Sequence, residues 1–175
     1  MKTILSEQQL ALTVKRLAHQ ILENNLQLHN TAIIGLQPRG IYLSDRIVQE
    51  LKQITGVKNH EYGKLDITFY RDDVRKSLHI ANQTDIPFNL ENKRVVLIDD
   101  VLYTGRTIRA ALDALLAFGR PSQVSLCVLI DRRFSRELPI QPDYTGKVID
   151  TIISQRVKVC WKENDEIEQV ILLDS

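Results

Sequence analysis

The chain has 175 residues, of which 43% are hydrophobic and 26% are charged, and this is the size and apolar content of one ordinary globular domain. Its 23 Lys and Arg residues nearly balance 22 Asp and Glu residues, so the net charge of +1 excludes a strong overall attraction to nucleic acid. No apolar run reaches the roughly 18 residues of a membrane span, and the amino terminus lacks a signal-peptide core, so we expect a cytoplasmic protein without a membrane partner.

The first third of the chain predicts a helix, a buried strand and a second helix. Ser6 and Gln9 have the pattern of a capping box, and the apolar residues that follow recur at helical spacing up to Asn24. The segment 31–36 is short and wholly apolar apart from its first residue, which is typical of a buried strand. Apolar residues at helical spacing then continue to Ile54.

The middle of the chain predicts three further strands and one more helix. Residues 64–70 alternate between apolar and polar, which indicates a strand. Residues 71–87 are polar and aperiodic, so we expect a long functional loop there. The apolar run 94–98 predicts a strand, which a helix ending at Gly119 follows, and 124–131 predicts the next strand.

Apolar strands that alternate with helices predict an α/β fold, with a central parallel sheet that helices cover on both faces. Ligands of such sheets bind beyond the carboxyl ends of the strands. This rule brings the loops after residues 36, 98 and 131 together.

The end of the chain departs from this alternation. Short β-like segments at 157–161 and 167–173 predict a small lobe over about residues 132–175, within a single domain that spans the chain. Cys127 and Cys160 lie in apolar segments without a CxxC partner, so we expect two buried thiols.

The residues that follow the strand at 94–98 indicate the chemistry. Asp99 and Asp100 only accept hydrogen bonds when ionised, which suits the neighbouring hydroxyls of a ribose. Thr104, Gly105 and Thr107 stand at a helix start, where unpaired N–H groups and the helix dipole favour a phosphate. Together they predict a site for a ribose 5-phosphate. No GxxxxGK[ST] or GxGxxG pattern occurs, which argues against nucleotide hydrolysis and hydride transfer.

The segment VVLIDDVLYTGRT (95–107) resembles the signature with which type I phosphoribosyltransferases bind 5-phosphoribosyl-1-pyrophosphate (PRPP). The segments GLQPRGIYLSDRI, LDITFYRDD and LIDRRFSRELPIQPDYTGK are similar to the pyrimidine-operon regulators of the PyrR family, and the resemblance covers nearly the whole chain. It implies the type I phosphoribosyltransferase fold with a small hood lobe. The implied reaction joins uracil to PRPP and gives UMP and pyrophosphate, with Mg²⁺ bound to PRPP and no direct metal ligand from the protein.

The resemblance also implies roles for individual residues. Pro38 and Arg39 form the loop that binds pyrophosphate, and the catalytic candidates are Arg39, Asp99 and Asp100. The counterpart of residues 71–87 closes over PRPP, which brings Arg71, Arg75 and Lys76 towards the pyrophosphate. The implied substrate-binding residues are Pro38, Arg39, Asp99, Asp100, Val101, Leu102, Tyr103, Thr104, Gly105, Arg106, Thr107, Arg132 and Val157, of which the last two border the nucleotide or base.

Two other functions remain open. Members of the PyrR family also bind a leader-RNA hairpin in the presence of UMP, so the chain could be mainly an RNA-binding regulator with weak catalysis. Asn24 and Gln141 stand where basic residues are expected in RNA-binding members, and no basic stripe with stacking aromatics is present.

A purine such as hypoxanthine is the alternative base, because backbone contacts in the terminal lobe select the base. The family default is a homodimer or a larger homo-oligomer. The candidate RNA contacts are Lys15, Arg16, His19, Arg136 and Lys147.

Overall fold

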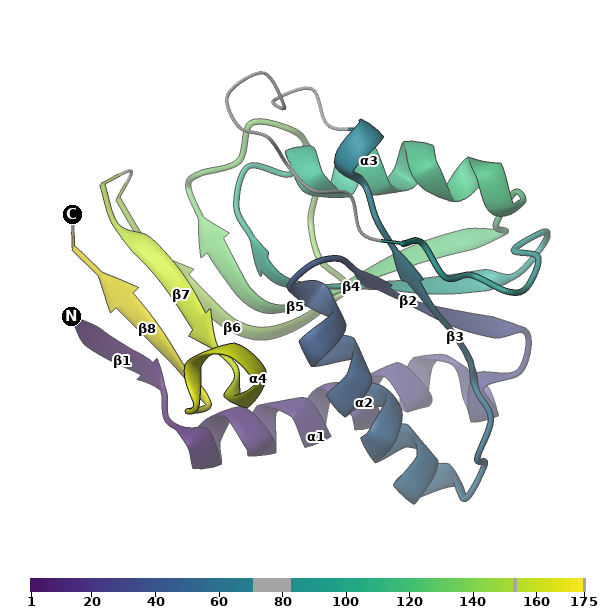
Figure 1. The fold of residues 1–175 in the computed structure, drawn as a ribbon, viewed down its shortest axis with the longest axis horizontal. Helices are drawn as coiled ribbons and strands as arrows, with labels where there is room; N and C mark the ends of the chain where they lie inside the picture. Colours follow the sequence, from purple (N-terminus) through teal and green to yellow (C-terminus); the bar gives the residue numbers. More distant parts are fainter. Residues whose placement is uncertain (71–82, 153, 175) are drawn as a thin grey trace.

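The computed structural model describes residues 1–70, 83–152 and 154–174, in which a five-stranded sheet lies beside a smaller three-stranded sheet (Figure 1). Most of the loop expected over 71–87 therefore lies outside the described residues. The elements are β1 (Lys2–Leu5), α1 (Glu7–Asn24), β2 (Thr31–Leu36), α2 (Gly40–Thr55), β3 (Glu61–Leu65), β4 (Arg94–Leu102), α3 (Arg106–Leu115), β5 (Gln123–Arg133), β6 (Tyr144–Asp150), β7 (Arg156–Cys160), α4 (Lys162–Asp165) and β8 (Gln169–Leu173).

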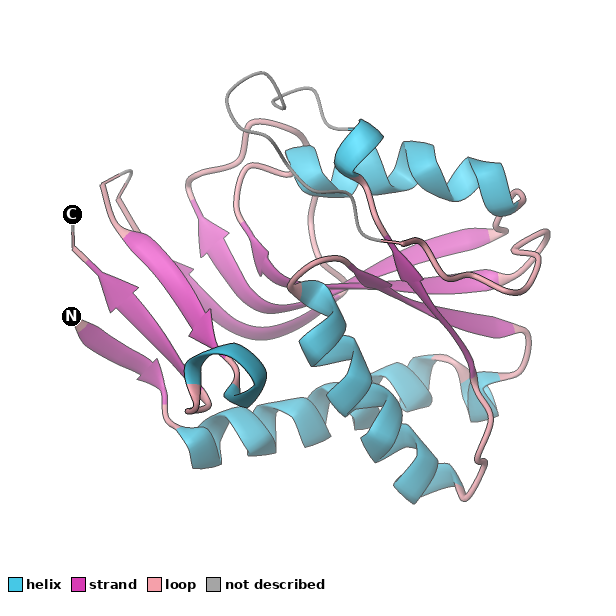
Figure 2. Ribbon diagram, in the orientation of Figure 1, coloured by secondary structure: helices cyan, strands magenta, loops and turns pink. Residues whose placement is uncertain are grey.

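The large sheet has the strand order β3-β2-β4-β5-β6, and every neighbouring pair is parallel. Helices α1 and α2 cover one face and α3 covers the other (Figure 2), and each face has its own apolar core. The predicted α/β class and parallel sheet are confirmed. Within the described residues, none of the helices is both long and apolar enough to cross a membrane.

Several local predictions are confirmed. Ser6 Oγ accepts a hydrogen bond from the Gln9 N–H at 3.3 Å and Gln9 Oε1 accepts one from the Ser6 N–H at 3.0 Å, so the capping box begins α1. Strand β2 is buried along its whole length, as its apolar composition predicted. Cys127 and Cys160 are buried free thiols.

The strand expected at 64–70 is displaced. Strand β3 ends at Leu65, and residues 68–70 form a short 3₁₀ helix instead. The cause is a local turn, because Asp66 Oδ1 accepts hydrogen bonds from both the N–H and the hydroxyl of Thr68, at 2.9 and 2.7 Å. Phe69 is consequently 87% exposed and does not continue the alternation of a half-buried strand.

The small sheet contains different residues from the lobe expected over about 132–175. Strands β7 and β8 agree with the predicted segments, but the third strand is β1, from the amino terminus. Strand β6 instead pairs with β5 at the edge of the large sheet. The sequence signal of β6 is weak because an edge strand keeps several exposed side chains, and β1 is only four residues long. We call the sheet β1-β8-β7 the hood, after the lobe that the family resemblance implied.

Candidate functional site

Three predicted residues meet at the carboxyl ends of β2 and β4. Asp99 and Asp100 lie in β4 and are each 8% exposed. Arg39 precedes α2, and its Nε lies 3.2 Å from Asp100 Oδ2. The second arm of Arg39, through Nη2, donates a hydrogen bond to the carbonyl of Val159 in β7. The guanidinium thus joins the buried carboxylate to the hood.

Burial opposes the ionisation of Asp100. Loss of hydration raises the pKa of Asp100 above its ordinary value, and the adjacent Arg39 guanidinium works in the opposite direction. Ionisation of this carboxyl group is therefore costly in the folded protein, and the Arg39 guanidinium, which also faces the site, offsets part of that cost.

Residues 103–107, at the start of α3, border a cavity, and we call them the phosphate loop after the phosphate site that the sequence predicts. Gly105 is the residue before α3 and has a φ of 92°, a left-handed conformation that glycine adopts without strain. Thr104 Oγ1 accepts a hydrogen bond from the Arg106 N–H at 3.3 Å, which shapes the start of the helix. The adjoining cavity of about 300 Å³ is lined by Asp99, Val101, Leu102, Tyr103, Thr104, Gly105, Arg106, Thr107, Ile108 and Glu137.

Arg132 connects this loop to the hood. Its guanidinium carbon lies 4.0 Å from the centre of the Tyr103 ring, within the range of a cation–π contact. Its Nε donates a hydrogen bond to Thr151 Oγ1 at 3.0 Å, and its Nη2 donates one to the carbonyl of Gln155 at 2.9 Å. Arg132 thus links the phosphate loop to the chain that leads into the hood.

The remaining predicted residues lie around this centre. Pro38 is in the turn between β2 and α2, directly before Arg39. Val157 lies in β7 opposite Leu172 and does not line the cavity beside the phosphate loop. The expected loop cations Arg71, Arg75 and Lys76 are outside the described residues.

The candidate RNA contacts separate into two groups. Lys15 and His19 are exposed on α1, where a spacing of four residues places them on one face. Arg16, on the same helix, donates a hydrogen bond to the carbonyl of Gly146. Lys147, in β6, donates one to the carbonyl of Ile4 at 3.0 Å. Arg136 differs, because it lies against the phosphate loop.

Sequence reasoning missed the contribution of the segment after β5. Glu137 lines the cavity, and its Oε2 lies 2.5 Å from Arg106 Nε. Arg136 donates a hydrogen bond to the carbonyl of Tyr103 at 2.6 Å. No periodicity marks this segment, and only its charged residues next to a predicted strand end could have drawn attention to it.

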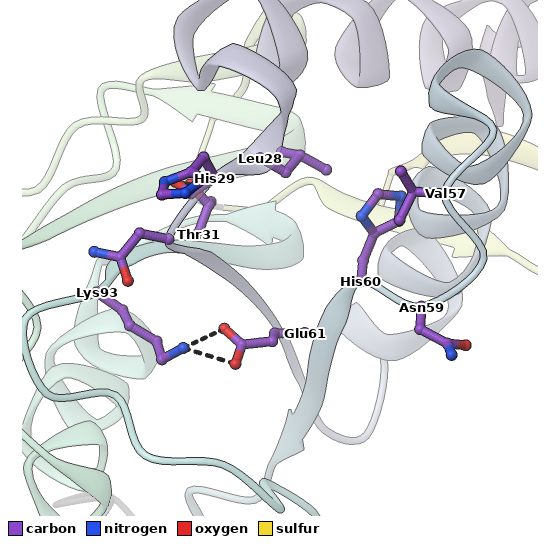
Figure 3. Close-up of a pocket in the computed structure, with 9 residues that line it drawn as sticks. Leu28, His29, Thr31, Val57, Asn59, His60, Glu61 and Lys93 are labelled. Carbon is purple, nitrogen blue, oxygen red and sulfur yellow. Dashed lines mark hydrogen bonds and ion pairs between the residues drawn. The ribbon is translucent and has the colours of Figure 1, made fainter.

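A second cavity, of about 560 Å³, lies at the opposite end of the strands, near the amino ends of β2 and β3 (Figure 3). His29 and His60 lie on opposite sides of it, and Lys93 Nζ contacts both oxygens of Glu61, at 2.6 and 2.5 Å. Its lining includes none of the predicted substrate-binding residues. The site that the sequence predicts is therefore the smaller cavity.

Gly40 sets how closely α2 approaches β4. A Cβ atom at this position would lie 2.7 Å from the carbonyl oxygen of Ile98 and 3.0 Å from Asp99 Cα. We therefore predict that Gly40→Ala moves the start of α2 and lowers the free energy of unfolding by about 1–3 kcal/mol. It should also weaken binding of PRPP, because Arg39 moves with the helix. Denaturant unfolding and calorimetric titration measure both effects.

Gly56→Ala is the matched control. Gly56 has a φ of 71°, and a Cβ atom added there would have no neighbouring atom within 4 Å, so its substitution strains only the backbone. This variant should lose stability and keep the affinity for PRPP. Equal affinities in Gly40→Ala and the wild type would show that the close approach does not shape the site.

The raised pKa of Asp100 predicts a stability difference with a definite pH dependence. The pKa of Asp100 is higher in the folded protein than in the unfolded chain, so folding favours the protonated carboxyl group. The free energy of unfolding therefore falls as the pH rises through the folded-state pKa. Asp100→Asn removes the charge, so its melting temperature should exceed that of the wild type near neutral pH. The difference should shrink towards about pH 4, where a carboxyl group becomes neutral. A variant that melts lower near neutral pH would mean that the contact with Arg39 outweighs burial.

Comparisons with known proteins identify the family of the chain. Residues 1–164 match the phosphoribosyl transferase domain family. The chain is 44% identical to "Bifunctional protein PyrR" of Bacillus mycoides (strain KBAB4), over 98% of this chain and 96% of the relative. The protein of the same name from Bacillus cereus (strain B4264) is 43% identical over the same shares.

Solved structures with the same fold include hypoxanthine phosphoribosyltransferases. The enzyme of Staphylococcus aureus has a TM-score of 0.70 at 18% identity, over 97% of this chain and 90% of that chain. The enzyme of Trypanosoma cruzi has a TM-score of 0.72 at 17% identity, over 99% and 97%. At these identities the likeness extends to the fold alone. The match over residues 1–164 and the similarity to the two Bacillus proteins show that the chain belongs to the phosphoribosyl transferase domain family and, within it, to the PyrR family.

Proposed function

We propose that this protein transfers the 5-phosphoribosyl group of PRPP to uracil and releases UMP and pyrophosphate. The observation that carries the proposal is the meeting of Arg39 with the buried Asp100 beside the cavity of the phosphate loop. A cation for the leaving group, carboxylates for the sugar and a helix start for the phosphate occur in the order in which PRPP presents them.

The chain acts mainly by positioning and by balancing charge. In the proposed reaction the bond between C1 of the ribose and the pyrophosphate breaks through a state with positive charge on the sugar. Asp99 and Asp100 accept hydrogen bonds from the ribose hydroxyls and stabilise that charge. Arg39 holds the pyrophosphate oxygens in a fork of N–H donors. No covalent intermediate with the protein is required.

Magnesium is the proposed cofactor, bound together with PRPP, and it neutralises the charge of the pyrophosphate. The described residues contain no group of three or more His, Cys, Asp or Glu side chains placed to hold a metal. Mg²⁺ commonly keeps several waters and binds through substrate phosphates with one or two carboxylates. In this proposal substrate oxygens would hold the ion without a direct ligand from the protein, and Asp99 and Asp100 contact the ribose hydroxyls.

The choice of uracil rests on the likeness to the PyrR family. Hypoxanthine is the alternative substrate, because the solved structures with the same fold include hypoxanthine phosphoribosyltransferases. Turnover of PRPP with each base, at equal concentrations, decides between them. We expect UMP from uracil and little product from hypoxanthine, and the reverse result would make the protein a purine enzyme.

A second proposed function is binding of a leader RNA in the presence of UMP, by a homodimer or larger homo-oligomer in the cytoplasm. Lys15 and His19, exposed on one face of α1, support it. Electrophoretic mobility shifts with a pyrimidine-operon leader hairpin, with and without UMP, test it. Substitution of both residues by Ala should weaken binding and leave turnover unchanged, whereas unchanged binding would exclude this face.

Asp100→Asn tests the role of the carboxylate in the reaction. We expect kcat to fall by about 100-fold or more, because the neutral amide cannot balance the positive charge that develops on the sugar. Asp113→Asn is the control, since Asp113 is exposed on α3 and forms its ion pair with Arg109 of the same helix, at 3.5 Å. Initial rates at saturating uracil and PRPP measure the effect, and wild-type rates in Asp100→Asn would refute the assignment.

A further inference from the structure

The segment after β5 holds two carbonyl groups of the phosphate loop. Arg136 Nη1 donates a hydrogen bond to the Tyr103 carbonyl at 2.6 Å. The N–H groups of Glu137 and Leu138 both donate to the Thr104 carbonyl, at 2.9 and 3.2 Å. The carbonyl oxygens of two consecutive peptide units are thus fixed by the same segment, 136–138, which we call the brace.

Peptide geometry gives these contacts a consequence for the ligand. Among the described residues, the cis peptide bond is the one between Gln37 and Pro38, so both of these loop peptides are trans. In a trans peptide the C=O and N–H groups point in opposite directions. The Tyr103 carbonyl shares its peptide with the Thr104 N–H, and the Thr104 carbonyl shares its peptide with the Gly105 N–H. Holding both carbonyls at the brace therefore directs both N–H groups away from it.

The N–H groups of Thr104 and Gly105 belong to residues that line the cavity. Backbone N–H groups at a helix start bind phosphate well when several converge on one point. A peptide unit that rotated would present its carbonyl oxygen instead and repel the anion. The orientation of these two units therefore decides whether the loop can bind a phosphate.

Arg136 is itself held by the sheet. Its Nη2 forms an ion pair with Asp131 Oδ1, with the two side chains only 22% and 11% exposed. Asp131 lies in β5 and pairs with Leu102 of β4, two residues before Thr104. A guanidinium can serve both partners because its N–H donors point in fixed, divergent directions. Arg136 thus fixes the position of the phosphate loop relative to the sheet.

We propose that Arg136 is a positioning residue, which orients the peptide units of the phosphate loop so that the N–H groups of Thr104 and Gly105 face the 5-phosphate of the substrate. The proposal rests on the PRPP site of the proposed function but not on the identity of the base. It also gives Arg136 a role other than the RNA contact that was expected from the sequence.

The test is binding of ribose 5-phosphate, a probe that has neither base nor pyrophosphate. We expect Arg136→Ala to weaken its binding by about tenfold or more, the effect of a free energy near 1.4 kcal/mol, and to raise KM for PRPP more than it lowers kcat. Arg136→Lys should recover part of the affinity. Arg133→Ala is the matched control, because Arg133 lies at the end of the same strand and pairs with the exposed Asp150.

Backbone amide resonances supply a readout that a loss of stability alone does not produce. In the wild type, ribose 5-phosphate should move the ¹⁵N–¹H signals of Thr104 and Gly105 downfield, and in Arg136→Lys these shifts should be smaller. Wild-type binding and wild-type shifts in Arg136→Ala would overturn the proposal. If Arg136→Ala does not fold, an absent response of Thr104 and Gly105 in the wild type, or full shifts in Arg136→Lys with unchanged KM, would overturn it.

The experiments can refute the role of Arg136 and the proposed uracil reaction independently of each other. A wild-type protein that binds ribose 5-phosphate through these two amides but makes no UMP from uracil would refute the uracil reaction and support the brace. A protein that makes UMP normally after Arg136→Ala would refute the brace alone.

Discussion

The parallel pairing of β2, β4 and β5 is the constraint on which the rest of the site depends. It places the carboxyl ends of three strands at one edge of the sheet, so that the turn after β2, the acids of β4 and the basic end of β5 meet. The two apolar cores stabilise this arrangement from both faces. Short-range signals alone could not bring residues 39, 100 and 132 to one place.

Asp100 and Arg39 place buried charge at this end of the sheet, where the proposed substrate binds. Asp100 is almost inaccessible, and Arg39 reaches both its carboxylate and the hood. Such an arrangement lowers the stability of the free protein, but it keeps the donors of Arg39 and the acceptors of Asp100 in fixed positions. On this account, the binding of a pyrophosphate group exchanges a contact within the protein for a contact with the ligand.

The end of β5 and the segment after it support the phosphate loop on two sides. Arg132 packs on the ring of Tyr103 and bonds to the chain that leads into the hood, while Arg136 donates to the Tyr103 carbonyl and pairs with Asp131. Together they fix the side chain and the backbone of Tyr103. The hood and the phosphate loop are in this way connected through nearby residues of one segment.

The parts of the structure that the sequence predicted are those with local causes. The capping box at Ser6, the buried β2, the acids in β4 and the threonines after it each follow from neighbouring residues. The pairing of β1 with β8 and the place of β6 in the large sheet depend on contacts between distant segments, so periodicity did not reveal them. The role of the brace was hidden for the same reason, because Arg136 and Tyr103 are 33 positions apart in the chain.

The central claim is that residues 99–107 bind a phosphorylated ribose. Isothermal titration of the full chain with PRPP and Mg²⁺, in the wild type and in a variant carrying both Asp99→Asn and Asp100→Asn, tests it most directly. The account predicts saturable binding to the wild type at one site per chain and a large loss of affinity in the variant. No binding to the folded wild type, or equal affinity in both proteins, would contradict it.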